Sequence, residues 1–394
     1  MQSLNRRQFL STGLVSTIAI PAGPLAVCAA DESPGSVWES PEGSSKPRVV
    51  FSGDGLGLTA AEYAQLLARL CDEQKLQRDV YCEGGPVAEL EKHMASVLGK
   101  EHAVFLPTGT LANNLAIRLL AGERRRVLVQ RESHLYKDEG DFAQLLSGLT
   151  LVPLAADRST FSLQEVEAEM RGFDGGPLPV PVGAISIECP VRRKSGEVFD
   201  FAEMKKISAF ARTRKIGLHL DGARLFLASA YTGISPAEYS ALFDTVYVSL
   251  YKYFNAGAGA ILAGPRSLLE NMAFTRRQFG GGMFQAWQYA AVALHFAKGF
   301  DHRFKNAVQA SEVMLRKLSE HPRFRVERIP SGSNVFALHF QVDDLKAAQK
   351  KLADANIFIR DPQPSGKMIL MNVNETLNRR PPEELAQAFI FAAG

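Results

Sequence analysis

Two residues in the middle of the 394-residue chain could do chemistry together, Lys252 and Asp221. Lys252 lies between two short apolar runs, Thr245 to Leu250 and Ala260 to Ala263, and the intervening segment is rich in glycine and alanine. Short apolar runs with such boundaries are typical of buried strands. Burial lowers the pKa of a lysine and suits its amine to Schiff-base formation with a carbonyl. The alternative is a lysine that extends from a strand end into solvent.

Asp221 belongs to the second segment, HLDGARL, at residues 219–225. The apolar residues Ile216 to Leu218 precede it and predict a strand that ends in an acid, where open α/β sheets bind their ligands. A carboxylate that keeps a pyridine nitrogen protonated, together with a Schiff-base lysine, is the pair that pyridoxal phosphate uses as an electron sink. Arg224 lies within reach of the same ligand. The alternative for Asp221 is a turn residue before the helix predicted from Ala223 to Ala230.

A glycine turn elsewhere in the chain could bind a phosphate. Thr108, Gly109 and Thr110 stand between the apolar run Ala103 to Leu106 and a predicted helix that continues through Leu120. The start of a helix has unpaired N–H groups and a positive dipole end, which favour an anion. Taken alone, the turn is equally explained as a helix cap.

Six segments in the right order resemble the threonine aldolase and β-eliminating lyase group of fold-type-I pyridoxal-phosphate enzymes, over most of the chain from about Phe51 to Phe340. The resemblance implies an α/β fold with a large, mostly parallel sheet domain and a small C-terminal α+β domain. It also implies a homodimer or homotetramer. The segments are DVYCEGGPVAELE (79–91), FLPTGTLANNLA (105–116), ESHLYKDEG (132–140), HLDGARL (219–225), the segment around Lys252, and FGGGMFQ (279–285).

The resemblance assigns cofactor roles residue by residue. Lys252 would carry pyridoxal 5'-phosphate, Asp221 would bind its ring nitrogen, and His134 would stack on the ring face. A lone histidine is otherwise more often structural. The other residues that it places at the cofactor are Thr108, Gly109, Thr110, Ser249 and Arg224.

Three further residues are candidates for substrate binding. Tyr81 lies in the loop 79–85, which in the family reaches a neighbouring subunit's active site, although a surface loop explains it equally well. Arg192 begins a run of three cations, and an arginine matches the shape of a carboxylate better than a lysine does. A solvated loop is the alternative for this run. Lys367 and Met368 stand where the family holds the substrate carboxylate with an arginine.

Several positions depart from the family pattern. The segment ECPVRRKSG (188–196) has Val191 where aldolases have the histidine of an Asn-Thr-His-Asn run, the group thought to handle the proton of the substrate β-hydroxyl. Phe284 replaces a family arginine, and Gly53 replaces the serine of a Ser-Asp-Thr turn. The scaffold is therefore retained while the groups that read the substrate are altered.

The predicted reaction is retro-aldol cleavage of a 3-hydroxy amino acid to glycine and an aldehyde, through a Schiff base of the substrate with pyridoxal phosphate. β-Elimination or amino acid racemisation stays open, because the altered residues decide which bond at Cα breaks. A non-catalytic scaffold that binds the cofactor is a further alternative, since Val191, Phe284 and Met368 have all lost the family side chain. Retention of Lys252, Asp221 and His134 argues against it.

The order of predicted elements indicates two domains. Between Glu101 and Leu262, short apolar runs alternate with longer helical ones, which favours a mostly parallel sheet covered by helices. Beyond Trp287, a long helical stretch through Leu318 precedes strand-like segments, including Phe358 to Arg360, and further helices. We therefore expect a large cofactor-binding domain over residues 51–286 and a small domain over residues 287–394.

The N-terminus has the features of an export signal. Arg6 and Arg7 precede an uncharged, mainly apolar stretch up to Ala30, which indicates a twin-arginine signal over residues 1–30 and a flexible linker over residues 31–50. Lipid attachment at Cys28 and a chance arginine pair are the alternatives. The expected partner is the twin-arginine export machinery and the expected location is the periplasm, or the cytoplasm if the signal is not used.

The composition excludes several classes of function. A net charge of +3 gives no argument for binding of nucleic acid or of an anionic membrane surface. Cleavage after Ala30 would leave three of the four cysteines, an odd number without metal-site spacing, so no metal site and no disulfide framework are expected. The pattern also predicts no transmembrane span.

Overall fold

The computed structural model describes residues 46–174, 178, 180–362 and 366–394. These residues belong to one compact unit, Val37–Gly394. The predicted twin-arginine signal, Cys28 and the predicted linker up to residue 45 lie outside the described residues. Among the described helices, none is long and apolar enough to cross a membrane.

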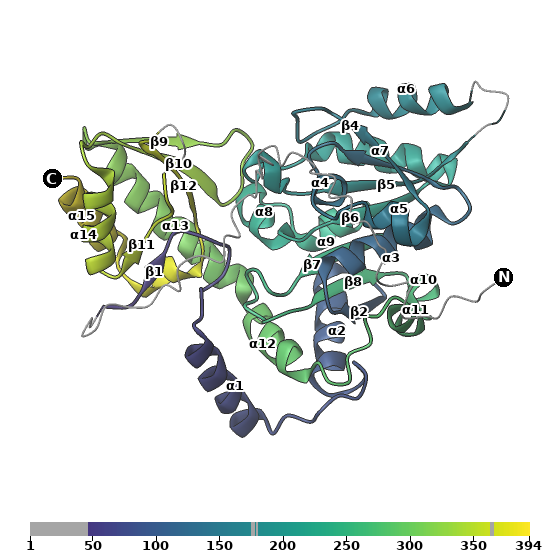
Figure 1. Cartoon of the computed structure of the whole chain (residues 1–394), viewed down its shortest axis with the longest axis horizontal. Coiled ribbons are helices and arrows are strands. Elements are labelled where there is room, and N and C mark those ends of the chain that lie inside the picture. Colours follow the sequence, from purple (N-terminus) through teal and green to yellow (C-terminus); the bar gives the residue numbers. More distant parts are fainter. Residues whose placement is uncertain (1–45, 175–177, 179, 363–365) are drawn as a thin grey trace, which may run out of the picture. The chain divides into compact units, whose positions relative to one another are not determined.

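A seven-stranded sheet forms the centre of the larger part of the molecule (Figure 1). Its strand order is β2-β8-β7-β6-β5-β3-β4, and β8 alone runs antiparallel to its neighbours β2 and β7. The predicted mostly parallel sheet is therefore confirmed. The strands are β2 (His102–Leu106), β3 (Arg126–Gln130), β4 (Thr150–Leu154), β5 (Val182–Glu188), β6 (Gly217–Asp221), β7 (Thr245–Ser249) and β8 (Ala260–Gly264).

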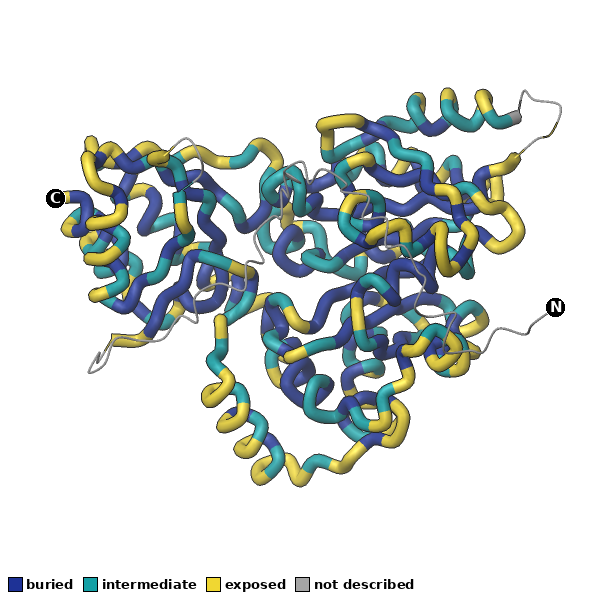
Figure 2. Tube along the Cα trace, viewed as in Figure 1, coloured by how far each residue is buried: buried dark blue, intermediate teal, exposed yellow. Residues whose placement is uncertain are grey.

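Helices cover both faces of this sheet. Successive residues of a strand point to opposite faces, so the side chains of the sheet pack against helices on both sides. On one face, Ile185 and Leu220 pack with side chains of α2 and α7. On the other, Ala184 and Tyr247 pack with α3 and α5. Figure 2 shows the buried residues concentrated along these strands. The helices of this part are α2 (Gly85–Leu98), α3 (Gly109–Ala121), α4 (His134–Lys137), α5 (Phe142–Ser147), α6 (Leu163–Asp174), α7 (Phe201–Arg214), α8 (Leu225–Thr232), α9 (Pro236–Ser240), α10 (Arg266–Leu269) and α11 (Met272–Gln278), with a 3-10 turn at Arg192–Lys194.

A second, smaller sheet is built from the C-terminal part of the chain. Its three antiparallel strands have the order β12-β10-β9, and α13, α14 and α15 accompany them (Figure 1). This matches the expected small C-terminal α+β domain. The elements are α12 (Trp287–Ala297), α13 (Phe300–Ser319), β9 (Phe324–Arg328), β10 (Val335–Phe340), α14 (Leu345–Asp354), β11 (Ile357–Phe358), β12 (Met368–Asn372), the 3-10 turn Glu375–Arg379 and α15 (Pro382–Ala393).

The first described residues pair with the C-terminal part. Strand β1 (Val49–Val50) runs parallel to β11, and the Asn374 side chain donates to the carbonyl of Val50 (2.9 Å). Helix α1 (Ala60–Gln74) follows, and it begins with a capping box, in which Thr59 accepts from the N–H of Glu62 and the Glu62 side chain accepts from that of Thr59. The turn between β1 and α1, which contains Asp54, is thereby held close to the C-terminal strands.

Two element boundaries differ from the sequence prediction. The helical stretch expected through Leu318 is two helices, α12 and α13, separated at Lys298 and Gly299. Gly299 has a φ of 71°, a left-handed conformation that favours glycine and interrupts a helix. The strand expected at Phe358 to Arg360 is β11, one residue earlier, where it pairs with β1.

Candidate active site

A small pocket opens at the carboxyl ends of the parallel strands, where open α/β sheets bind their ligands. It holds about 290 Å³ of empty space, including its open mouth. Strands β5, β6 and β7 end at this edge of the sheet, and the N-terminus of α3 faces it. The residues that line the pocket are Gly109, Thr110, Asn113, His134, Glu188, Asp221, Ala223, Arg224, Tyr247, Tyr251 and Lys252.

Lys252 follows the end of β7 and is half-buried. Loss of hydration and, after it, the positive charge of Arg224 lower the pKa of its amine to about 8. The carboxylates of Asp221 and Asp54 oppose this shift only in part. Near neutral pH, a substantial fraction of the amine is therefore unprotonated and able to act as a nucleophile.

Asp221 is the last residue of β6 and only 3% of its surface is exposed. One carboxylate oxygen accepts a hydrogen bond from Asn113 Nδ2 (2.8 Å) and the other accepts one from the backbone N–H of Ala223 (3.1 Å). These two donors fix the carboxylate at the bottom of the pocket, as the sequence predicts for a partner of a pyridine nitrogen.

Arg224 is anchored by one nitrogen. Its Nε donates to Asp54 Oδ2 (2.6 Å), and Asn334 and Asn372 donate to Asp54 Oδ1 (3.2 and 3.3 Å). Burial alone would raise the pKa of Asp54, but the charges of Arg224 and Lys252 outweigh it and hold that pKa below its ordinary value. Among the described residues, no protein group accepts from the two terminal nitrogens of Arg224, so they remain available to a ligand.

The phosphate turn has the geometry of an anion site. Thr108 caps α3 and accepts from the N–H of Leu111 (3.2 Å), while the N–H groups of Gly109 and Thr110 have no acceptor within the helix. A Cβ added to Gly109 would lie 2.0 Å from the Tyr247 hydroxyl oxygen, so glycine is required for the close approach of α3 to β7. Ser249 is completely buried, and its hydroxyl makes no hydrogen bond of good geometry within the described structure, although the Tyr247 hydroxyl is close enough to interact with it.

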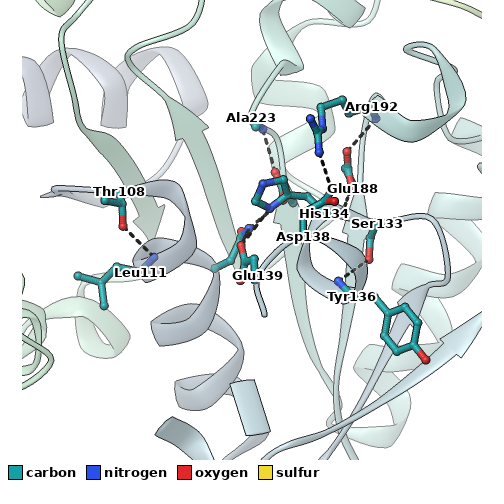
Figure 3. A network of polar contacts seen from close by, with 12 residues as sticks. Thr108, Leu111, Ser133, His134, Tyr136, Asp138, Glu139, Glu188, Arg192 and Ala223 are labelled. Atoms are coloured by element: carbon teal, nitrogen blue, oxygen red, sulfur yellow. Dashed lines mark hydrogen bonds and ion pairs between the residues drawn. The ribbon is translucent and has the colours of Figure 1, made fainter. Parts of the chain in front are cut away.

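His134 begins α4 and contacts two buried carboxylates (Figure 3). Its backbone N–H donates to Glu188 Oε2 (2.5 Å), and its Nδ1 lies 3.2 Å from Glu139 Oε1. Burial alone would lower the pKa of this imidazole, but the hydrogen bond to Glu139 and the charges of Asp221, Glu139 and Glu188 raise it. Burial also raises the pKa of Glu139 and that of Glu188 above the ordinary range.

The three candidate substrate residues lie outside the pocket lining. Arg192 is close by, where it forms an ion pair with Asp138 (2.6 Å) beside His134 (Figure 3). Tyr81 is 41% exposed and packs edge-on against Phe284. Lys367 is exposed and precedes β12, at the opposite end of that strand from Asn372, so the structure does not bring it to this pocket.

Two structural findings concern the altered family positions. Val191 is fully buried and contributes no polar group where the family histidine would stand. The turn that begins with Gly53 supplies Asp54, whose carboxylate orients Arg224. The acid of the Ser-Asp-Thr pattern therefore retains a function although its serine is lost.

Sequence reasoning missed the polar lining residues Asn113 and Glu188, and it missed Glu139, which contacts His134 behind the pocket. Each lies in a segment that had already been singled out, and Glu188 ends the apolar run of β5 just as Asp221 ends that of β6. An acid at the end of a buried strand is the pattern that could have identified Glu188. For Asn113 and Glu139, only their positions within the recognised segments could have identified them as site residues.

The parallel sheet, the smaller C-terminal sheet and a lysine and acid at the strand ends define the fold-type-I class of pyridoxal-phosphate enzymes. Within this class, the chain belongs to the β-eliminating lyase family, whose sequence model matches residues 66–340.

Three relatives illustrate the similarity. A Schizosaccharomyces pombe protein assigned as a low-specificity L-threonine aldolase is 28% identical over 305 residues, which are 76% of this chain and 78% of that protein. The alanine racemase TOXG of Cochliobolus carbonum is 31% identical over 251 residues, 62% of this chain and 64% of the racemase. A crystal structure of a Listeria monocytogenes protein assigned as an L-allo-threonine aldolase has a TM-score of 0.73 at 27% identity, over 88% of this chain and 95% of the other.

Proposed function

We propose that the protein is a pyridoxal-phosphate-dependent lyase that cleaves a 3-hydroxy amino acid to glycine and an aldehyde. The observation that carries the proposal is the shared pocket of Lys252, Asp221 and the two terminal nitrogens of Arg224. Membership of the β-eliminating lyase family and the similarity to threonine aldolases support the same reaction.

The residues present fit pyridoxal phosphate. The phosphate would bind to the N–H groups of Gly109 and Thr110 and to the hydroxyl of Ser249, which is buried without a hydrogen bond of good geometry among the described residues. Asp221 would hold the ring nitrogen and Lys252 the aldehyde carbon, while the imidazole of His134 would contact the ring face. When bound, the cofactor supplies an electron sink for a bond at the substrate α-carbon.

The protein residues bind the substrate and move its protons. Arg224 binds the substrate carboxylate with its two terminal nitrogens, because Asp54 fixes the guanidinium through Nε. Lys252 Nζ exchanges a proton with the substrate amine, since the lowered pKa allows both protonation states near neutral pH. With Val191 in place of a histidine, the unprotonated form of His134 is the base for the β-hydroxyl proton. It accepts the proton at Nε2, because Nδ1 is engaged with Glu139, and this form is populated at higher pH than usual because the carboxylates raise the pKa of this imidazole.

Amino acid racemisation is the second candidate function. It is favoured by the 31% identity to an alanine racemase and by the buried, apolar side chain of Val191. Racemisation breaks the bond from Cα to hydrogen and needs no base for a β-hydroxyl group, so this reaction tolerates valine at position 191.

The proposal also covers assembly and location. We propose a homodimer or homotetramer in which Tyr81 lies at the subunit contact; its support is the exposed cluster of Tyr81, Phe284 and Arg277, with Arg277 over the Tyr81 ring at 4.2 Å. The arginine pair at residues 6 and 7 supports export to the periplasm by the twin-arginine route.

The deciding experiment is a reconstitution of the purified chain with pyridoxal phosphate. We expect a yellow absorption band that Lys252→Ala abolishes, and release of glycine from threonine, allo-threonine or phenylserine. Arg224→Lys keeps the charge but loses the paired geometry, and we expect it to raise KM about tenfold with less change in kcat.

The outcomes separate the alternatives. A wild-type chain that stays colourless with added cofactor contradicts the whole proposal. A yellow protein that releases no glycine from the 3-hydroxy amino acids but exchanges the α-proton of alanine for deuterium supports racemisation instead. A yellow protein that reacts with no amine is a scaffold.

A further inference from the structure

Asn113 connects the two side chains that would hold the cofactor ring. Its Nδ2 donates to Asp221 Oδ2 (2.8 Å) and to Glu139 Oε1 (3.1 Å), and Glu139 Oε1 also contacts His134 Nδ1 (3.2 Å). The edge-binding carboxylate and the face-contacting imidazole therefore belong to one hydrogen-bond network. The Asn113 side chain is buried, with 1% of its surface exposed.

His219 contacts the other end of the Asn113 amide. It is completely buried on β6, where Thr245 Oγ1 lies 2.9 Å from its Nδ1 and Asn113 Oδ1 lies 3.0 Å from its Nε2. Burial lowers the pKa of His219 to about 4, so the ring is neutral and has one N–H. With the amide oxygen facing Nε2, that hydrogen is on Nε2, because an amide oxygen can only accept, and the Thr245 hydroxyl can donate to Nδ1.

The opposite orientation of the amide is strongly disfavoured. Reversal would turn Asn113 Oδ1 toward the carboxylates of Asp221 and Glu139 and would leave both without their shared donor. A buried carboxylate oxygen without a donor, facing a second acceptor, is strongly destabilised. The two carboxylates thus keep the donating end of Asn113 directed at them, and the neutral ring of His219 adapts its tautomer to the oxygen at the other end.

We infer that Asn113 is a positioning residue that couples Asp221 to His134 through Glu139. The inference rests on the proposed function for the identity of the ring that Asp221 and His134 would hold, while the coupling is a property of this chain alone. Asn113 holds Asp221 in place directly. It also stabilises the ionised form of Glu139, and that charge favours protonation of His134.

The test compares two neighbouring buried asparagines of α3. Asn113→Ala removes the shared donor, whereas Asn114→Ala removes an equally buried amide whose oxygen accepts from Ser147 Oγ (2.7 Å), outside this network. The titration of His134 is followed by NMR in the cofactor-free protein, with its signal assigned from His134→Gln. Cofactor affinity is measured separately by equilibrium titration.

We expect Asn113→Ala to lower the pKa of His134 by about 1 unit and to weaken cofactor binding about tenfold, as expected for one hydrogen bond to a charged group. Asn114→Ala should change neither value, although both variants lower thermal stability. Glu139→Gln, which keeps the shape and removes the charge, should reproduce the shift of His134 with a smaller loss of affinity. Equal effects of the two alanine variants, or no shift of His134 in Asn113→Ala, would overturn the inference.

A substitute variant and a readout that needs no cofactor keep the inference testable. If Asn113→Ala does not fold, Asn113→Ser takes its place; its hydroxyl can donate to only one carboxylate, and we expect a shift of His134 in the same direction. The titration of His134 needs neither cofactor nor substrate, so failure of the wild type to bind pyridoxal phosphate contradicts the proposed function and leaves the coupling to be judged by NMR alone.

Discussion

Asp54 lies far from the lysine and the acid of the pocket in sequence, yet it fixes the arginine between them. The pair with Arg224 joins the turn after β1 to the loop after β6. Of the two asparagines that donate to Asp54, Asn334 directly precedes β10 and Asn372 ends β12. A buried ion pair is costly unless further hydrogen bonds satisfy its oxygens. Here those bonds come from the smaller sheet, so the small domain orients a pocket residue of the large one.

Replacement of Asp54 by asparagine tests this orientation. Asp54→Asn removes the charge that holds Arg224 Nε, so the guanidinium loses its fixed direction. We expect KM for the amino acid to rise about tenfold, with a smaller fall in kcat, in steady-state assays. Glu375→Gln is the matched control, since it removes the Arg303–Glu375 pair (2.6 Å) outside the pocket. An equal rise in KM for both variants contradicts a specific role of Asp54.

The lowered pKa of Lys252 predicts a pH dependence. Only the neutral amine attacks an aldehyde, so attachment of pyridoxal phosphate to the cofactor-free protein should accelerate as pH rises and level off above about 8. Stopped-flow absorbance with a pH series measures this rate. A midpoint at the ordinary lysine pKa would show that burial and Arg224 do not act on this amine. In Arg224→Gln, the midpoint should move to higher pH.

At the level of elements, the sequence predicts most of what local chemistry determines. Alternating apolar runs identify β6 and β7, Thr59 with Glu62 marks the start of α1, and the strand that ends in Asp221 is correctly placed. The partners of Asp221 are not predictable in this way. Asn113 is 108 positions away, and only the packing of α3 on β6 brings the two together.

The contact between α3 and β7 gives a prediction at this scale. Gly109→Ala would place a methyl group 2.0 Å from the Tyr247 hydroxyl and force the first turn of α3 away from the strand. We expect cofactor affinity to fall at least about tenfold, because the phosphate-binding N–H groups move with that turn. Equilibrium titration with the cofactor measures the loss.

Gly172→Ala provides the control for this substitution. Gly172 lies in α6 and has open space around it, so alanine there should leave cofactor affinity unchanged and raise stability slightly, as expected from helix propensity. If Gly109→Ala binds the cofactor as tightly as Gly172→Ala, the proposed phosphate site is wrong.

Glu91 in α2 gives a second prediction for an element, this time for stability. Its carboxylate accepts the N–H of Phe105 in β2 (2.7 Å), and burial raises its pKa to about 7. Between its unfolded pKa near 4.5 and about 7, the folded state holds a proton that the unfolded state has lost. Stability therefore falls as pH rises through this window.

Glu91→Gln removes this pH dependence because glutamine can still accept from Phe105 without ionising. We expect the variant and the wild type to be equally stable near pH 5, and the variant to be more stable by roughly 2 kcal/mol near pH 8. Urea unfolding at both pH values measures the difference. A variant that is less stable at the higher pH would show that the nearby Arg276 needs the charge of Glu91.

For the whole molecule, the sequence predicts the two main sheets but not the pairing of β1 with β11. The order of apolar runs indicates a large, mostly parallel sheet followed by a small α+β domain, and both are present. The pairing of β1 with β11 joins segments about 300 residues apart, and a two-residue strand is too short to give a periodic pattern. This pairing holds Asp54 beside the smaller sheet, so the pocket is complete only in the folded chain.

A pocket assembled from segments this distant requires that the chain fold before it can bind its cofactor, and this bears on the proposed export route. The twin-arginine route carries folded proteins, so the proposed signal at Arg6 and Arg7 allows cofactor binding in the cytoplasm before transport. Replacement of both arginines by lysine keeps the charge but removes the recognised pair. We expect the variant to stay in the cytoplasm in a loaded, yellow form, while the wild type is recovered from the periplasm after cell fractionation. Lysine at Arg124 and Arg125, an exposed pair in the described structure, is the control and should leave export unchanged. A cytoplasmic wild type, or export of the variant at the wild-type level, would refute the proposed route.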